Sequence, residues 1–440
     1  MPTAFMGMRG VGNWADNQVP ESWAQYILHE YPNGSAPLFA LTSMFKQETV
    51  DSYKYHWWKK TLPTQSGACS VYIDAALGTP YVYATHIDTH GIATGVVYAK
   101  VAEALAKEFK VGHTVILRDS DQYLVDVSAR VVDVFYDGSN SYIACKLLEA
   151  DDNGGATYNL ATVDRILIKG SGYEEGSVAP DAIGYDPVEF SNYVQEFRDT
   201  LDISDIARAT TLRTGDAYKE EKRSCAELHS IGIEKTGFWG TKYSGTGING
   251  KPLRLSQGII PFTAENASAN VLDYLTNSGA AYAGKTWLQA GKKFLNTNFA
   301  TLFRYLPGEA LAFVGDAALL AINELAETHG DIQLVPTSAS YGLQVMKWIT
   351  PFGTINLKTH PLFSHETTNQ RMMVLLHPKN VRFCPLVGGG LNFRTKFEQN
   401  MQIPGQHSKV DGYYTAGLWK FYFPNQFMVM HNLGLDNIAS

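Results

Sequence analysis

The sequence predicts an α+β fold, in which strands and helices occupy largely separate stretches of the chain. Runs of β-branched residues divided by turn-forming clusters fill residues 113–169. A long two-faced strand over 191–203 leads into a long charged helix over 216–239. Strands alternate again in the last hundred residues, and the chain lacks the regular strand–helix alternation of a parallel α/β fold.

The first fifty residues carry little regular pattern. Glycines and prolines such as Gly10 and Pro20 interrupt a series of aromatic residues that includes Trp14 and Trp23. A segment of this kind buries apolar area but has too little periodicity to build a core of its own. We therefore expect residues 1–50 to form an arm that packs on another surface. A terminal extension folded on its own domain is the alternative.

Residues 51–190 combine an extended start with a β-rich stretch. In DSYKYHWWKKTL, the residues Tyr53, Tyr55 and Trp57 alternate along an extended chain. A helix is expected over 97–109. The runs HTVIL, YLVDVSARVVDVFY, YIACKLL and VDRILIKG follow, separated by DSDQ, DGSNS and DDNGG. They predict a β-meander, a small domain of about 66–190 inserted into a longer loop.

The strand that follows this stretch has two different faces. Its apolar side carries Tyr193, Phe197, Leu201 and Ile203, and its polar side carries Glu196, Arg198, Thr200 and Asp202. A strand of this kind, far from a core of its own, needs a second apolar surface to cover it.

The helix over 216–239 has a plausible N-cap in Asp216 and a stop signal in Gly240. Its narrow apolar stripe contains Tyr218, Cys225, Leu228, Ile231 and Phe238. Such a stripe suits a helix that lies along a surface or across subunits. Two more helices are expected, one after Lys285 and one from Asp316 to Gly330. The runs RMMVLL and LWKFYF are predicted strands.

Composition restricts the class of protein. The chain has 440 residues with 45% hydrophobic content, which excludes global disorder. It has no apolar run of about 18 residues and no secretory signal at Met1. Residues 66–190 hold 8 basic and 18 acidic residues, so the acidity is concentrated there and no basic stripe marks a nucleic-acid binder. The four cysteines form no CxxC pair, which predicts buried free thiols in a reducing compartment.

Two short motifs offer candidate sites for chemistry. GAAYAGKT fits the phosphate-binding loop pattern, with Gly279, Gly284, Lys285 and Thr286 as the cofactor-binding candidates. The preceding NVLDYLTNS is not a clean buried strand, so a loop that enters a helix is the competing interpretation. In THIDTH, the residues His86, Asp88 and His90 would share one side of an extended chain and offer metal ligands. Ordinary polar strand residues are the alternative there.

The order of these elements resembles one family of viral proteins. The landmarks are KYHWWKKTLP, EEGS at Glu174–Ser177, SNYVQEFRDTLDISDIARA, FVGDAALLAINELA and DGYYTAGLWKFYFPNQFMVMHNLG. Together they span most of the chain. They resemble the major capsid proteins of tailed bacteriophages with the Hong Kong 97-like fold, and more narrowly a subgroup with a β-rich insertion in the extended loop.

The resemblance implies a domain plan and a function. Residues 1–50 would be the N-terminal arm, residues 51–212 the extended loop with its insertion, and residues 213–440 the peripheral and axial domains. The helix over 216–239 would be the spine helix. The protein would be a structural subunit, without enzymatic activity or cofactor, that self-assembles in the host cytoplasm into the icosahedral shell of the virion around double-stranded DNA.

The same resemblance implies partners and contacts. The partners would be copies of itself in hexamers and pentamers, a separate scaffolding protein, the portal protein, an optional decoration protein and packaged DNA through non-specific proximity, with no membrane. Subunit contacts are expected at Trp14, Trp23, Tyr53, Tyr55, Trp57, Tyr193, Phe197 and Leu201. The acidic insertion is expected outside the shell, because DNA repels it. The alternative is a nucleotide-binding enzyme that uses Gly279–Thr286.

Overall fold

The computed structural model describes residues 36–43, 48–61, 63–152, 155–210, 216–276, 281–329, 333–340 and 343–438. The chain divides into two compact units. One runs from Trp58 to Val188, and the other combines the chain up to Trp57 with the chain from Glu189 onward. We call them the insert and the body, and each is described on its own.

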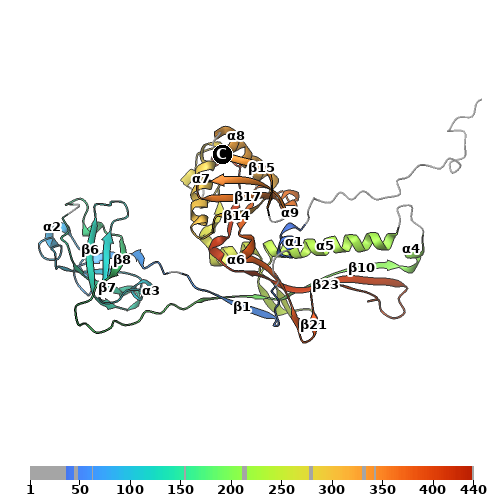
Figure 1. The fold of residues 1–440 in the computed structure, drawn as a ribbon, viewed down its shortest axis with the longest axis horizontal. Coiled ribbons are helices and arrows are strands. Elements are labelled where there is room, and N and C mark those ends of the chain that lie inside the picture. Colours follow the sequence, from blue (N-terminus) through green and yellow to red (C-terminus); the bar gives the residue numbers. More distant parts are fainter. Residues whose placement is uncertain are drawn as a thin grey trace, which may run out of the picture. The chain divides into compact units, whose positions relative to one another are not determined.

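The insert is a closed β-barrel. Its strands pair in the order β2-β8-β5-β6-β7-β4-β3, and only Cys69 separates the two strands at the ends of this order. One stretch of chain therefore pairs with β8 through its first half and with β4 through its second half, which closes the sheet on itself. Strands β6, β7 and β8 of this barrel are labelled in Figure 1. A closed barrel leaves no unpaired strand edge. The strands are β2 (Ser66–Ala68), β3 (Ser70–Tyr72), β4 (Val96–Lys100), β5 (His113–Arg118), β6 (Asp126–Phe135), β7 (Tyr142–Leu147) and β8 (Arg165–Ser171).

The alternation of apolar residues fills the barrel. In β5 and β6, for example, Val115, Leu117, Val127 and Ala129 are buried while the residues between them are not. The four predicted strands are present, but the simple meander is wrong because β8 returns to pair with β5. The predicted helix over 97–109 is also wrong. Val97 and Ala99 alternate with partly exposed neighbours in β4, and only α3 (Glu103–Ala106) is helical there. The other short helix is α2 (Tyr83–His86).

The larger sheet of the body has the order β13-β24-β18-β14-β17-β16-β15. Helices α7 (Trp287–Phe303) and α8 (Asp316–His329) lie beside it (Figure 1). Phe294, Phe299 and Ile322 from these helices are fully buried in the core that they share with the sheet. The strands are β13 (Val271–Asp273), β14 (Glu309–Val314), β15 (Gln333–Ser340), β16 (Leu343–Thr350), β17 (Gly353–Thr359), β18 (Met373–Leu376) and β24 (Met428–His431).

A second sheet of the body carries the long helix. Strands β10 (Gln195–Ser204), β23 (Ser408–Phe421) and β19 (Val381–Pro385) pair in that order, and β22 (Lys396–Glu398) also pairs with β23. Helix α5 (Ala217–Trp239) runs along β10 and β23 (Figure 1). The smaller helices are α1 (Pro37–Ser43), α4 (Asp205–Ala209), α6 (Ile259–Asn266) and α9 (Pro361–His365).

Three two-stranded ladders complete the described chain. They are β1 (Lys54–Lys59) with β9 (Val188–Tyr193), the hairpin β11 (Tyr243–Thr246) with β12 (Pro252–Leu255), and β20 (Val387–Gly388) with β21 (Leu391–Asn392). The first ladder lies where the chain passes from the body into the insert and back. Together these elements confirm the α+β class expected from the sequence.

Helix α5 begins and ends as predicted, but its buried face differs from the predicted stripe. The Asp216 side chain accepts a hydrogen bond from the Tyr218 backbone N–H at 3.0 Å, and Gly240 follows the last turn. Leu228, which was assigned to the stripe, is 62% exposed. The buried residues are Cys225, His229, Ile233, Glu234, Gly237 and Phe238. Three of these six residues, His229, Glu234 and Gly237, are polar or lack a side chain. A search for apolar residues at helical spacing therefore does not find this face.

Candidate subunit-contact surfaces

The predicted contact residues do not form one surface. Trp14 and Trp23 lie outside the described residues. Trp57, Phe197 and Leu201 are only 6%, 8% and 4% exposed. Trp57 packs on Phe190 and Phe262, and Phe197 packs on Phe383. The expectation that these three side chains await a neighbour is therefore wrong, because their own subunit already covers them.

The tyrosines of the set remain accessible. Tyr53 is 56% exposed, and Tyr55 and Tyr193 are half-buried. Tyr193 does not share a side with Phe197 as predicted. Strands β9 and β10 are separated at Val194, and burial shifts there from Asn192 and Val194 to Phe197 and Leu201. Because of this irregularity, even-numbered residues are buried before it and odd-numbered residues after it. Tyr193 therefore points to the side of the strand opposite to Phe197.

Asn192 sits at this irregularity and was missed by the sequence analysis. Its side chain is 1% exposed. The Oδ1 atom accepts from the backbone N–H groups of Tyr193 and Gln257 at 2.9 Å each. The Nδ2 group donates to the Trp419 carbonyl at 2.7 Å and to Ser256 Oγ at 3.1 Å. One amide therefore joins three segments where the returning strand enters the body, and an isolated Asn in a strand gives no periodic signal of such a role.

The described part of the arm is built into its own subunit. The backbone N–H groups of Leu38 and Phe39 at the start of α1 donate to the two oxygens of Glu234 at 2.8 and 2.7 Å. His360 Nε2 lies 2.8 Å from Glu234 Oε1, and both of these side chains are fully buried. Leu38 is also fully buried. Helix α1 thus belongs to the core of the body.

A second polar contact holds the end of the arm. Lys420 Nζ lies 2.7 Å from Glu48 Oε2, and the Tyr422 hydroxyl also donates to Glu48. Burial alone would raise the pKa of Glu48, but the hydrogen bonds from Lys420 and Tyr422 outweigh it and hold this pKa below its usual value. Val50 then bonds to Pro385 and Val387 through its backbone.

An Asp–His–Thr arrangement, in which the histidine and the threonine are buried, joins α5 to its sheet. His229 Nδ1 lies 2.7 Å from Asp199 Oδ2 in β10, and His229 Nε2 lies 2.8 Å from Thr415 Oγ1 in β23. The order of groups is that of a hydrolytic triad. However, Thr415 is fully buried and its hydroxyl donates to Thr395 at 3.0 Å. No substrate reaches this hydroxyl, so the arrangement is structural.

The candidate nucleotide site is occupied by the protein itself. Gly279 lies outside the described residues. Gly284 N donates to the Asn437 carbonyl at 2.6 Å, and Trp287 N donates to Asp436 Oδ1 at 2.8 Å. Thr286 forms a capping box with Gln289 at the start of α7, and the Lys285 side chain is exposed. A carboxylate thus stands at the helix end where a phosphate-binding loop would present free N–H groups.

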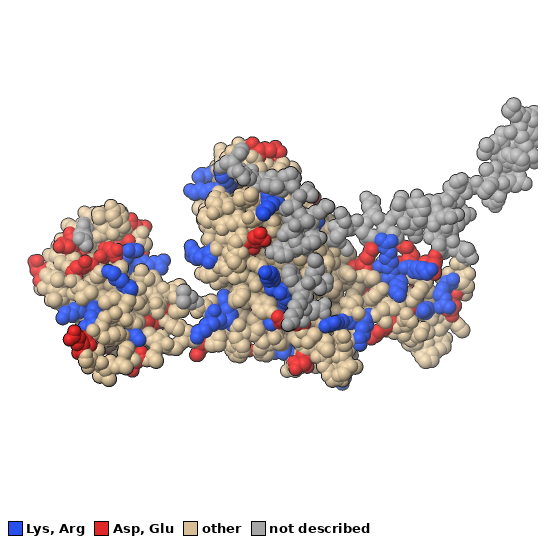
Figure 2. Space-filling model, in the orientation of Figure 1, with Lys and Arg blue, Asp and Glu red and all other residues tan. Residues whose placement is uncertain are grey.

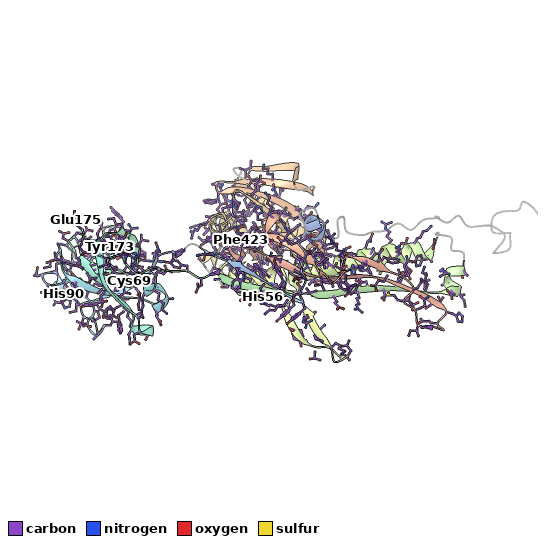
Figure 3. All side chains as sticks on the ribbon, turned by 60° about the horizontal axis from the view of Figure 1, so that its bottom comes forward. His56, Cys69, His90, Tyr173, Glu175 and Phe423 are labelled. Atoms are coloured by element: carbon purple, nitrogen blue, oxygen red, sulfur yellow. The ribbon has the colours of Figure 1, made fainter. Side chains whose placement is uncertain are left out.

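The candidate metal ligands do not share one side. His86 ends helix α2, and the chain continues through turns rather than as a strand. His86 Nδ1 accepts from Val82 N at 2.9 Å, and His90 Nδ1, labelled in Figure 3, lies 3.0 Å from the Val96 carbonyl. Over the described residues, no group of three or more His, Cys, Asp or Glu is arranged to hold a metal.

All four cysteines are free and buried, as predicted. Burial raises the pKa of the Cys69 and Cys384 thiols to about 12. They are therefore packing groups rather than nucleophiles. The described part of the chain also contains no helix that is long and apolar enough to cross a membrane.

Comparison with known proteins gives the family. A family model described as the SU10 major capsid protein matches residues 11–434. The chain belongs to the SU10 major capsid protein family. It is 25% identical over 350 residues to the major capsid protein of Pseudomonas phage PaMx41, a match that covers 78% of this chain and 73% of that relative.

Several solved structures are similar to this SU10-family chain. A chain of Mycobacterium phage Bobi is 7% identical and matches 97% of each chain with a TM-score of 0.42. The capsid of Myoviridae phage XM1 is 12% identical and matches 60% of this chain and 82% of its own, with a TM-score of 0.36. The holo-SrpI encapsulin complex from Synechococcus elongatus PCC 7942 is 12% identical, with coverages of 58% and 79% and a TM-score of 0.38.

Family membership decides between the two functions that the sequence left open. The protein is a tailed-phage major capsid protein, a structural component of the virion that forms the shell of the head. The nucleotide-binding enzyme is the wrong alternative, in agreement with the carboxylate of Asp436 at the start of α7. The α+β element order implied by the Hong Kong 97-like resemblance is the one found in the described residues.

Proposed function

We propose that this capsid protein assembles as hexamers and pentamers into an icosahedral shell around double-stranded DNA. In this plan residues 1–50 are the arm, residues 51–212 the extended loop with the β-rich insertion, and residues 213–440 the peripheral and axial domains with α5 as the spine helix. The compact unit from Trp58 to Val188 supports an insertion close to the expected 66–190.

The observation that carries this proposal is the contrast between two adjacent tryptophans in β1. Trp57 is 6% exposed and packs in the body core, whereas Trp58 is 62% exposed. An exposed Trp leaves a large apolar area in water, and Trp is enriched among the residues that dominate protein interfaces. A neighbouring copy that covers Trp58 recovers this area, at about 25 cal/mol for each Å² of apolar surface.

Replacing Trp58 by alanine tests the proposal. We expect the subunit to melt as the wild type does and the yield of sedimentable particles to fall about tenfold or more, because an interface anchor is lost. Trp57→Ala is the matched control, since the same truncation there should destabilise the isolated subunit. Particle yield is measured by sedimentation and negative-stain microscopy. If the Trp58→Ala protein assembles as well as the wild type, Trp58 does not contribute to the contacts between subunits.

The proposed partners beyond the shell itself follow from the resemblance. They are a separate scaffolding protein, a portal protein, an optional decoration protein and the packaged DNA. On the face in Figure 2, acidic and basic side chains are interspersed over both units, without a continuous basic field. On this face, the distribution supports non-specific proximity to DNA.

We also propose that the insert faces the outside of the shell. The stretch 66–190 has 18 acidic and 8 basic residues, and an inner wall of this charge would repel DNA within a Debye length of about 10 Å. Limited proteolysis of intact, filled particles should therefore cut first in the exposed turn at Gly138–Asn140. If that turn stays protected while α5 is cut, the two faces are reversed.

A further inference from the structure

The β11–β12 hairpin is a basic element with an exposed apolar tip. From Thr241 to Leu255 the chain carries Lys242, Lys251 and Arg254 and no acidic residue. Lys242 donates to Ser191 Oγ at 3.2 Å, and Arg254 stacks on the Tyr53 ring at 4.1 Å. Within the described chain, no carboxylate forms an ion pair with these three cations.

The apolar residues of this hairpin are exposed to solvent in the single subunit. Ile248 at the turn is fully exposed, and Tyr243 and Leu253 are 48% and 45% exposed. Figure 3 shows the hairpin, which is yellow-green, projecting from the rest of the body. An isolated two-stranded hairpin is marginally stable in water, so an element of this kind gains stability when another surface covers it. Because the protein forms a shell from identical copies, a second copy is the partner that its function provides.

The β5–β6 loop of the insert carries an exposed carboxylate of opposite charge. The connection between β5 and β6 contains Asp121, which is exposed and forms no ion pair with a cation of the described chain. Tyr123 and Leu124 beside it are 83% and 45% exposed. Within the loop, Asp119 Oδ1 accepts from Asp121 N at 2.9 Å. An acidic group and apolar groups thus lie next to each other on this loop, as basic and apolar groups do on the hairpin.

We propose that the β11–β12 hairpin of one copy docks on the β5–β6 loop of a neighbouring copy's insert. Lys251 faces Asp121 of the neighbour, and Ile248 covers the apolar side chains beside it. The apolar contact supplies affinity, while the opposite charges set orientation and exclude like-charged surfaces. The barrel has no free strand edge, so side chains of its loops rather than strand pairing have to make such a contact.

Charge reversal at each partner tests the pairing. Lys251→Glu and Asp121→Lys should each lower the particle yield about tenfold at low salt, with a smaller loss at high salt. The double variant should regain most of the wild-type yield. Asp137→Lys, at an exposed turn elsewhere on the same barrel, is the control and should assemble normally. Thermal melting of each subunit checks that folding is unchanged.

Mixing the two single variants shows whether the contact joins different copies. In a mixture, the hairpin of the Lys251→Glu protein, which carries Glu, can dock on the loop of the Asp121→Lys protein, which carries Lys. The unchanged Lys251 of the Asp121→Lys protein can likewise dock on the unchanged Asp121 of the Lys251→Glu protein. Both contacts are attractive, so the mixture should assemble better than either protein alone. Rescue by the double variant without rescue by mixing would place the contact within one copy and overturn the proposal. Loss of assembly without any rescue, or no loss at all, would overturn it as well.

Discussion

The Glu234→Ala subunit is expected to lose about 3–5 kcal/mol of its free energy of unfolding, as when one partner of a buried polar pair is removed. The Glu234 carboxylate is fully buried and accepts from Leu38 N at 2.8 Å and from Phe39 N at 2.7 Å. It also lies 2.8 Å from Nε2 of the fully buried His360. Alanine leaves two N–H groups and an imidazole without a partner in the core, and each such group has a desolvation cost.

The geometry also fixes how His360 takes part. Its Nδ1 atom accepts from Leu362 N at 3.2 Å, so Nε2 carries the proton that is donated to Glu234. Glutamine at position 234 keeps an acceptor for α1 but adds an N–H₂ group, so Glu234→Gln should lie between wild type and alanine.

Urea unfolding of the unassembled subunit measures these differences. Lys235→Ala is the matched control, because Lys235 is the next residue on α5 and is exposed, and it should change stability by no more than about 0.5 kcal/mol. Hydrogen exchange should speed up selectively in residues 36–43 of the Glu234→Ala protein, where α1 loses its acceptors. A loss below about 1 kcal/mol, or exchange that is unchanged in this segment, would show that the carboxylate does not hold the arm.

The elements that the sequence predicted well have a regular period and clear ends. Helix α5 was located by the cap at Asp216 and the glycine at 240, and the four long barrel strands by their turn clusters. Closure of the barrel could not be predicted in this way. It depends on a seven-residue stretch around Cys69 that pairs with two different strands. Local periodicity does not show which distant segments pair with each other.

The contact residues were harder to predict for a physical reason. Alternation in KYHWWK separates one face of a strand from the other but does not say which face meets the protein's own core. The alternation places Trp57 among the contact residues, whereas in the structure Trp57 is buried and Trp58 is exposed. Likewise, the irregularity at Val194 reversed the side on which Tyr193 lies. Burial is a property of tertiary packing, so apolar residues at an interface and in a core look alike in sequence.

The face of α5 that packs on the sheet depends on a glycine, which a search for apolar residues overlooks. A Cβ atom at Gly237 would lie 2.8 Å from Trp419 Cζ2 and 3.3 Å from Leu38 Cδ2. Both of these neighbours are fully buried, and Trp419 also packs on Phe383. The helix therefore approaches β23 closely only because position 237 has no side chain.

Two glycine-to-alanine changes on this one helix are expected to alter stability in opposite directions. Alanine favours a helix over glycine by about 1 kcal/mol. At Gly232 no atom lies within 4 Å of the added Cβ, so Gly232→Ala should stabilise the subunit by about 0.5–1 kcal/mol. At Gly237 the collision with Trp419 forces the helix away from the sheet, and overpacking of this kind costs about 1–3 kcal/mol or more.

The Gly237→Val protein should show the largest loss of stability. Its side chain adds two methyl groups beyond the Cβ, and the Cβ alone already collides with Trp419. We expect a loss of about 3 kcal/mol or more in the free energy of unfolding and few particles, since α5 spans the body beside β10 and β23. Denaturation of the unassembled subunits, followed by assembly of the same preparations, measures both quantities. If Gly232→Ala and Gly237→Ala shift stability by the same amount in the same direction, the close approach of α5 to Trp419 is not what position 237 provides.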